Sequence, residues 1–333
     1  MQGKALSVVL AFWIGCSDDG APAVLPDAGV CHACEFRVVH GWPELSEGYV
    51  LGQVSGVAID SGGEVLVFHR ADHPWLASTP ASLIAQPALL RLRSATGAIE
   101  ADFGRGQFKV PHGLRVDAQD HLWVTDVGLH QVFELSRDGE PLRSFGVADE
   151  PGSDETHFNQ PTDVAIAADG SIYVADGYGN SRVVQLDAQG NFVRAWGTRG
   201  SQPGQFDTPH SIALDAQRRV YVADRGNARI QRFDEHGEFI DEWKSAELGR
   251  PWALTVAKDG SVFVVDGGDQ NPAPPDRARI LRLNARGELQ EGWSSFGNYD
   301  GQIYGGHAIA VTKHGEVLVG DVYGMRVQKF TRR

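Results

Sequence analysis

The stretch Pro111-His112-Gly113-Leu114-Arg115-Val116-Asp117 decides the fold, because the chain repeats its pattern five more times. Successive copies are 42 to 57 residues apart. The other copies begin at Val54, Pro161, Pro209, Pro251 and Gly306. A recurrence at this spacing indicates a repeat architecture in which each copy forms one structural unit.

Each copy predicts a set of four antiparallel strands. Eleven residues past the second position of every copy lies a leucine or an aromatic residue. Three residues further lies His69 in the first copy and, in the others, Asp126, Asp176, Asp224, Asp266 and Asp321. Alternating apolar runs separated by Asp/Gly turns are typical of β-strands. Six four-stranded repeats predict an all-β fold, a six-bladed β-propeller.

The two ends of the repeat region are expected to share one blade. The last copy stops after its third strand, at Phe330, whereas residues 36–40 match the fourth-strand pattern of Phe192–Trp196. Pairing of these two segments would close the ring and remove exposed strand edges.

The composition favours a large folded domain and disfavours two classes of partner. Apolar residues make up 42% of the chain, which is enough for a sizeable core. The formal net charge is −13, and no basic stripe offsets it. We therefore expect neither a nucleic acid nor an anionic membrane surface as a partner.

The N-terminal segment is interpreted as an export signal. Lys4 is followed by an apolar run over residues 5–15, about the length of a signal-peptide core and too short to cross a bilayer. The run ends at Cys16 in a pattern that resembles a bacterial lipoprotein box. Residues 1–16 are thus expected to direct export, with a lipid anchor on Cys16; an ordinary signal peptide cut nearby is the alternative.

Residues 17–34 are expected to form a flexible tether, because they are rich in Asp, Ala and Pro. Within it Cys31 and Cys34 can pair in an oxidising compartment. The propeller is expected to span residues 35–333. This organisation predicts a periplasmic or cell-surface lipoprotein.

Histidine occupies one register position in every second copy. The second position of the six copies reads Ser55, His112, Thr162, His210, Trp252 and His307. Equivalent positions on alternate blades of a six-fold ring form an equilateral triangle around the axis. Three neutral imidazoles with an open fourth position are typical of a catalytic Zn²⁺ site, so we predict one here. The alternative is a set of polar channel residues without a metal.

A second register position, fifteen residues further on, carries positive charge in two copies. It holds Arg70 in the first and Arg225 in the fourth, and Tyr178 is offset by one residue from it in the third. The loops that carry these residues are expected at the same channel mouth. Arginine forks suit a carboxylate-bearing substrate, whereas surface ion pairs are the alternative for both side chains.

Two levels of resemblance follow from particular motifs. Asn180-Ser181-Arg182 and Asn227-Ala228-Arg229 resemble the NHL repeat. More specific motifs, from about residue 45 to the end, resemble the peptidyl-α-hydroxyglycine α-amidating lyases. They include Leu51-Gly52-Gln53-Val54-Ser55-Gly56-Val57, Phe68-His69-Arg70, Pro111-His112-Gly113-Leu114, Trp123-Val124-Thr125-Asp126-Val127, Asp176-Gly177-Tyr178 and Ala223-Asp224-Arg225.

This resemblance implies an activity and a set of site residues. It implies a six-bladed propeller whose Zn²⁺ is held by His112, His210 and His307, with Arg70 and Arg225 as active-site arginines. The implied substrate is a peptide ending in α-hydroxyglycine, cleaved to the peptide amide and glyoxylate. In that reaction the metal would acidify the carbinol, and the arginines would hold the carboxylate. Tyr178, with a pKa depressed by the metal and the arginines, would take the hydroxyl proton.

The resemblance also implies a calcium ion, and here the sequence departs from the family. The calcium would be bound by the backbone carbonyls of Val57 and Leu114 and by an aspartate directly after the third histidine. That position is Ala308, which argues against calcium in this form. A family methionine two residues before the same histidine is Gly305. The altered positions leave room for a related carbinolamide substrate.

Two other functions remain open at the level of sequence. The first is an exported NHL-type propeller that acts as a binding module with a structural channel metal. The second is a different lyase or a lactonase on the same propeller; gluconolactonase-like propellers use calcium and carboxylate ligands, so the three histidines disfavour them.

Overall fold

The computed structural model describes residues 35–75, 79–268 and 277–333. Within these ranges the regular secondary structure consists of β-strands alone, arranged in six four-stranded sheets. The expected export segment, the tether, Cys31 and Cys34 lie outside the described residues. No helix that is long and apolar enough to cross a membrane occurs in the described ranges.

Each copy of the repeat forms one sheet, and these sheets are called blades 1 to 6. Blade 1 contains β2 (Val54–Ile59), β3 (Val65–His69), β4 (Leu89–Leu92) and β5 (Ile99–Phe103). Blade 2 contains β6 (Pro111–Val116), β7 (Leu122–Asp126), β8 (Gln131–Leu135) and β9 (Pro141–Phe145). Blade 3 contains β10 (Asp163–Ile166), β11 (Ile172–Asp176), β12 (Arg182–Leu186) and β13 (Phe192–Trp196).

The second half of the chain continues this order. Blade 4 contains β14 (Pro209–Leu214), β15 (Val220–Asp224), β16 (Arg229–Phe233) and β17 (Phe239–Trp243). Blade 5 contains β18 (Pro251–Val256), β19 (Val262–Asp266), β20 (Arg279–Leu283) and β21 (Leu289–Trp293). Blade 6 contains β22 (Gly306–Val311), β23 (Val317–Asp321), β24 (Arg326–Arg332) and the N-terminal β1 (Phe36–Val38).

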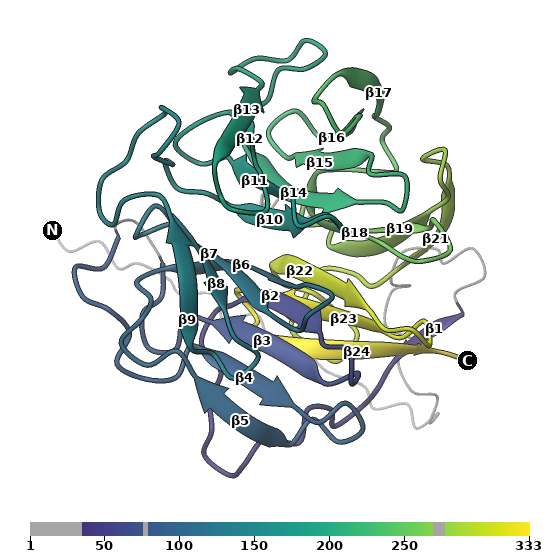
Figure 1. Cartoon of the computed structure of the whole chain (residues 1–333). Coiled ribbons are helices and arrows are strands. Elements are labelled where there is room, and N and C mark those ends of the chain that lie inside the picture. The colour runs from purple at the N-terminus through teal and green to yellow at the C-terminus, as the bar shows by residue number, and fades with distance from the viewer. Residues whose placement is uncertain (1–34, 76–78, 269–276) are drawn as a thin grey trace, which may run out of the picture. The chain divides into compact units, whose positions relative to one another are not determined.

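The first strands of the six copies form the inner ring. Each contacts the first strand of the next blade, and β22 contacts β2, which closes the circle (Figure 1). All neighbouring strands within a blade are antiparallel. The expected six-bladed β-propeller is thereby confirmed.

The apolar core is divided into six clusters, one between each pair of consecutive blades. Between blades 2 and 3, for example, Trp123 and Val132 pack against Ile172 and Val174. The second strand of every blade is buried along its whole length. Burial on both faces explains why these strands are nearly continuous apolar runs rather than alternating ones.

The ends of the repeat region meet in blade 6, as expected. Strand β1 pairs antiparallel with β24, with Phe36 opposite Arg332 and Val38 opposite Phe330 (Figure 1). The Phe36 ring stacks on Trp293 of blade 5, with 4.3 Å between the ring centroids. The N-terminal strand therefore supplies the fourth strand of the last blade and part of the core between blades 5 and 6.

A buried aspartate ends the second strand in blades 2 to 6 and organises the surrounding loops. In blade 4, Asp224 accepts hydrogen bonds from the backbone amide of Asp207 (2.8 Å) and from Nε of Arg229 (2.7 Å). Arg229 also donates to the backbone carbonyls of Ser201, Gln202 and Gln205. This pair fastens the loop between blades 3 and 4 to the middle of blade 4.

Blade 1 has His69 at the position of these aspartates. Its Nδ1 accepts hydrogen bonds from the backbone amides of Gly52 (3.2 Å) and Ala71 (3.1 Å). A neutral imidazole therefore holds the loop that a carboxylate holds in the other blades. Because His69 is buried, its pKa is lowered from its ordinary value to about 4.

Replacement of Arg229 by methionine is expected to destabilise the fold strongly. The change leaves the buried Asp224 carboxylate and three loop carbonyls without their main donor, which costs about 3–5 kcal/mol when one partner of a buried pair is removed. Urea unfolding of Arg229→Met checks this against Arg286→Met, where the native Arg286 side chain is 79% exposed and pairs, among the described residues, with Glu288 alone. Equal midpoints for the two variants would show that the buried pair does not stabilise the blade.

His69 is expected to make stability dependent on pH. The pKa of His69 is about 4 in the folded chain and 6.5 ordinarily. At a pH between these two values, His69 binds a proton in the unfolded chain but not in the folded one. Stability is therefore complete above pH 6.5 and falls toward pH 4, by roughly 3 kcal/mol for this group. His69→Asn keeps an acceptor for the two amides but has no such proton, so its unfolding free energy should fall less over this window. Urea unfolding at several pH values measures both proteins. Equal losses of unfolding free energy between pH 6.5 and 4 in the wild type and His69→Asn would contradict this account.

Candidate active site

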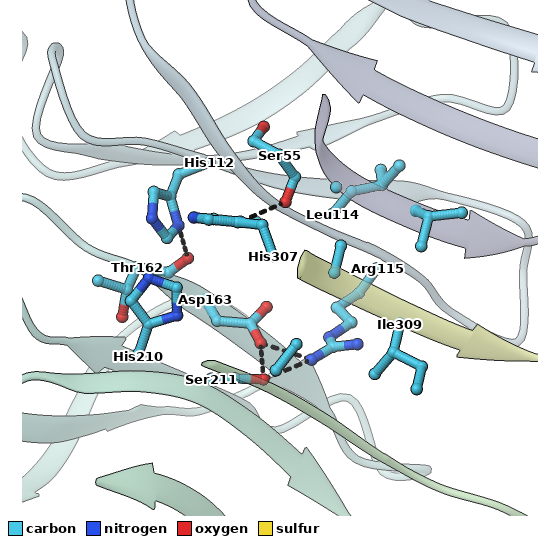
Figure 2. A pocket seen from close by; sticks show the side chains of 15 residues that line it. Ser55, His112, Leu114, Arg115, Thr162, Asp163, His210, Ser211, His307 and Ile309 are labelled. Carbon is cyan, nitrogen blue, oxygen red and sulfur yellow. Dashed lines mark hydrogen bonds and ion pairs between the residues drawn. The ribbon is translucent and has the colours of Figure 1, made fainter. Parts of the chain in front are cut away.

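Three buried histidines converge at the start of the innermost strands of blades 2, 4 and 6. They are His112 in β6, His210 in β14 and His307 in β22. Their ring centroids are 4.5 to 4.9 Å apart, and one ring nitrogen of each lies within 4.8 Å of the others. The register thus brings the three imidazoles together, in a group that can hold a metal ion (Figure 2).

Each histidine is oriented by the neighbouring blade. Its Nδ1 faces a backbone carbonyl of the residue at the equivalent position in the next blade. The pairs are His112 with Thr162 (2.6 Å), His210 with Trp252 (2.6 Å) and His307 with Ser55 (2.9 Å). Because a carbonyl only accepts, Nδ1 must donate a proton, and this leaves the Nε2 lone pair free to bind a metal.

The environment keeps the three imidazoles neutral. Burial lowers the pKa of His112 and His210 well below the ordinary value, and the neighbouring histidines and arginines lower it further. Burial, Arg70 and Arg225 lower the pKa of His307 to about 3. Neutral, oriented and buried imidazole nitrogens are the donors that Zn²⁺ prefers in sites that keep an open position. The residues therefore fit the implied metal.

Tyr178, in the loop after β11, places its hydroxyl group beside two of these histidines. The oxygen lies 2.8 Å from Nε2 of His210 and 3.1 Å from Nε2 of His112. Nη1 of Arg225 donates to the same oxygen at 3.4 Å. The arginines act to lower the pKa of Tyr178, as expected, but burial is the larger effect and raises it. Burial therefore outweighs the two arginines and keeps the phenol protonated.

Arg70 lies at the same site, buried and only partly satisfied. Its Nη1 donates to Oε1 of Gln53 (2.8 Å) and its Nε to the carbonyl of Pro111 (3.0 Å). Its Nη2 is buried without a hydrogen-bond partner in the described part of the chain. Burial lowers the pKa of this guanidinium to about 10. An unsatisfied buried cationic donor is costly on its own, so the site is suited to an anionic group from outside.

Arg225 is held in a different way, by an aromatic ring. Its guanidinium carbon lies 3.7 Å from the ring centroid of Trp252. Among the described residues neither Arg225 nor Arg70 forms an ion pair with a carboxylate, which disfavours the alternative of surface ion pairs. A cleft beside Tyr178 is lined by Asp207, Thr208, Arg225, Gly226, Arg250, Trp252 and Gly268.

Two aromatic residues at the site escaped the sequence analysis. The Trp75 ring lies 5.1 Å from that of Tyr178 and below the Arg70 guanidinium, which is 5.2 Å away. Trp75 belongs to a loop outside the repeat register, so no pattern marks it. Tyr323 has a usable signal, because it occupies in blade 6 the register position of Tyr178 in blade 3. Its charge opposes the lowering of the Arg70 pKa by burial and adds to the raising of the Tyr178 pKa.

Gly305 makes the position of Tyr323 possible. A Cβ atom on Gly305 would lie 2.3 Å from Cδ2 of Tyr323. The tyrosine ring therefore occupies the space next to the residue that replaces the methionine of the resembling lyases. The glycine at position 305 therefore alters the side of the site, where Tyr323 lies, and leaves the three histidines in place.

The positions implied for calcium lie further along the channel. Val57, Leu114 and Ala308 line a cavity together with the three histidines, Arg115 and Asp163. The Ala308 methyl group offers no ligand, and the Arg115 guanidinium already brings a positive charge into this cavity. The residues present do not fit calcium in the implied form.

A second group with metal-ligating atoms lies in blade 2, but those atoms are engaged by protein donors. It consists of Asp117, His121 and Glu134. Asp117 accepts from Nε1 of Trp123 (2.9 Å) and from backbone amides, while Glu134 bonds Arg143 and His121. We interpret this group as a structural ion-pair network.

Comparisons with known proteins agree with the repeats and with the resemblance. The NHL repeat family model matches residues 108–135, 158–186 and 206–233. A Drosophila melanogaster protein named peptidyl-alpha-hydroxyglycine alpha-amidating lyase 2 is 32% identical over 84% of this chain and 70% of its own length. The Rattus norvegicus peptidylglycine alpha-amidating monooxygenase is 38% identical over 87% of this chain, which spans 31% of that protein.

Solved structures share the fold at much lower sequence identity. A streptogramin B lyase is 16% identical, with a TM-score of 0.61 over 90% of this chain and 98% of its own. A gluconolactonase from Xanthomonas campestris is 15% identical, with a TM-score of 0.61 over 92% and 99%. These likenesses bear on the propeller alone.

Proposed function

The chain belongs to the peptidyl-α-hydroxyglycine α-amidating lyase family, and from this premise we propose that it is a Zn²⁺-dependent lyase. Its substrate would be a peptide with a C-terminal α-hydroxyglycine, or a related carbinolamide, and its products the peptide amide and glyoxylate. One observation carries the proposal: the Tyr178 hydroxyl lies 2.8 and 3.1 Å from Nε2 of two converging histidines, beside two arginines that have no carboxylate partner among the described residues.

His112, His210 and His307 would hold the metal ion through Nε2. The bound ion would act as a Lewis acid that lowers the pKa of the substrate carbinol. The backbone carbonyls of the odd-numbered blades keep the three imidazoles in one tautomer and one orientation. Such fixed ligands lose little entropy when the site is filled.

The two arginines would bind the substrate carboxylate. Nη2 of Arg70 is a buried donor that has no partner in the described ranges, and a carboxylate oxygen would satisfy it. Arg225 is steadied by Trp252 and points a second guanidinium at the same site. The cleft beside Tyr178 leaves space for the peptide on the other side of the scissile bond.

Tyr178 would move the proton that the reaction requires. In the cleavage the carbinol O–H proton leaves, a C=O bond forms, the C–N bond breaks and the amide nitrogen gains a proton. Since burial keeps the phenol protonated, Tyr178 is suited to donate to the leaving nitrogen and accept from the carbinol oxygen. In this proposal Tyr178 passes a proton on, whereas a Tyr178 with a depressed pKa would have acted as a base alone.

The metal site is tested by its stoichiometry. We expect the purified chain to bind one Zn²⁺, and His210→Ala to weaken that binding by at least about 100-fold, because a ligand is lost. His236→Ala is the matched control, since its side chain is 60% exposed and outside the site. Calorimetric titration with Zn²⁺ measures both. An unchanged affinity in His210→Ala would remove the three histidines from the proposal.

The lyase activity is tested by glyoxylate release from a peptidyl-α-hydroxyglycine. Tyr178→Phe should retain Zn²⁺ but lower kcat by about 10²–10⁴-fold, the usual effect of a lost proton-transfer group. Tyr299→Phe, whose residue is 81% exposed, should be unchanged. A zinc-loaded wild type without turnover would favour the binding module with a structural metal. Full turnover in Tyr178→Phe would remove the tyrosine from the chemistry.

A further inference from the structure

Four oxygen atoms surround one nitrogen in the channel, next to the three histidines. The nitrogen is Nη2 of Arg115, which comes from β6 in blade 2. It lies 2.5 Å from Oδ2 of Asp163, 3.2 Å from Oγ of Ser211, 3.1 Å from the Ile212 carbonyl and 3.3 Å from the Leu254 carbonyl. Figure 2 shows Arg115 pointing at Asp163 and Ser211. One side chain of blade 2 thus reaches blades 3, 4 and 5.

The arrangement resembles a cation cage more than a set of hydrogen bonds. An Nη2 group carries two hydrogens, so it cannot make four well-directed bonds at once. What the four oxygens share is attraction to positive charge. A carboxylate, a hydroxyl and two backbone carbonyls around one centre are the oxygen ligands that hard cations such as Ca²⁺ take in proteins.

The repeat register relates the cage to the positions implied for calcium. Asp163 and Ser211 occupy the position directly after the histidine column, as Ala308 does in blade 6. Ile212 and Leu254 occupy the next position, as Val57 and Leu114 do in blades 1 and 2. The carboxylate that the channel lacks at Ala308 is therefore present on the opposite side of the ring, where it is paired with Arg115.

We propose that Arg115 is a built-in cation, which occupies the channel in place of a divalent ion and positions the histidines. Asp163 follows Thr162, whose carbonyl orients His112, and Ser211 follows His210. Ser211 and the Ile212 amide also donate to Oδ2 of Asp163, at 2.8 and 3.1 Å. The Arg115 charge therefore holds together the backbone segments that carry two of the three imidazoles. This inference does not depend on the lyase reaction.

The proposal predicts a calcium dependence that only a variant shows. The melting temperature of the zinc-loaded wild type should not change when millimolar CaCl₂ is added. Arg115→Ala should melt about 5–10 °C lower, because Asp163 loses its partner. Calcium should then enter the vacated oxygen cage of Arg115→Ala and restore most of the lost melting temperature. This recovery should be smaller in Arg115→Ala/Asp163→Asn, which lacks the carboxylate.

Two further variants keep the test decisive if Arg115→Ala folds poorly. Arg115→Lys retains the charge and should stay close to the wild type in melting temperature and Zn²⁺ affinity. Arg115→Met retains most of the volume without the charge, and should lose both unless calcium is supplied. If Arg115 only filled space, Arg115→Met would instead be the variant closer to the wild type in melting temperature and Zn²⁺ affinity, and Arg115→Lys the weaker one. The proposal is overturned if calcium stabilises the wild type but not Asp163→Asn, or if Arg115→Ala melts like the wild type.

Discussion

The position of every functional residue depends on one repeated interaction, the buried acceptor at the end of the second strand of each blade. In blade 2, Asp126 accepts from the amides of Lys109 and Val110, just before the histidine of β6, and from Gly128 in the following turn. In blade 6, Asp321 likewise accepts from Gly305, two residues before His307. The same carboxylate thus fixes the start of the innermost strand and the turn that follows the second strand. These are the two places that carry the histidines, the arginines and Tyr178.

The alternation of histidine around the ring has a mechanical explanation. Each imidazole in an even-numbered blade needs an acceptor for its Nδ1 proton, and the backbone carbonyl of the next blade provides it. Because only the backbone is used, the odd-numbered blades are free to vary their side chains at this position. Trp252 uses that freedom to hold Arg225, and Thr162 donates its hydroxyl to the Pro209 carbonyl at 2.7 Å. Six histidines would have left no room for these supports.

Much of this could be predicted from the sequence because a propeller converts register into position. The repeat located the six blades, the closing strand, the histidine triangle and the loops of Arg70, Arg225 and Tyr178. Trp75 could not be predicted, since it lies in a loop outside the register. The direction of the Tyr178 pKa could not be predicted either, because it depends on how far burial outweighs two nearby guanidinium groups. Arg115 escaped for a third reason: its long side chain acts three blades away from its own position in the repeat.

The balance of charge along the channel explains why an internal cation suits this chain. A divalent ion on three neutral imidazoles, with Arg70 and Arg225 beside it, would make the mouth of the channel strongly positive. Calcium bound beside Asp163 would add a net positive charge to this channel, at a cost that is larger where water is scarce. Arg115 brings a single charge that Asp163 neutralises, so the pair adds cohesion between blades without adding net charge. With Ala308 offering no carboxylate, the Arg115–Asp163 pair across the ring supplies the charge contact that keeps the channel walls together.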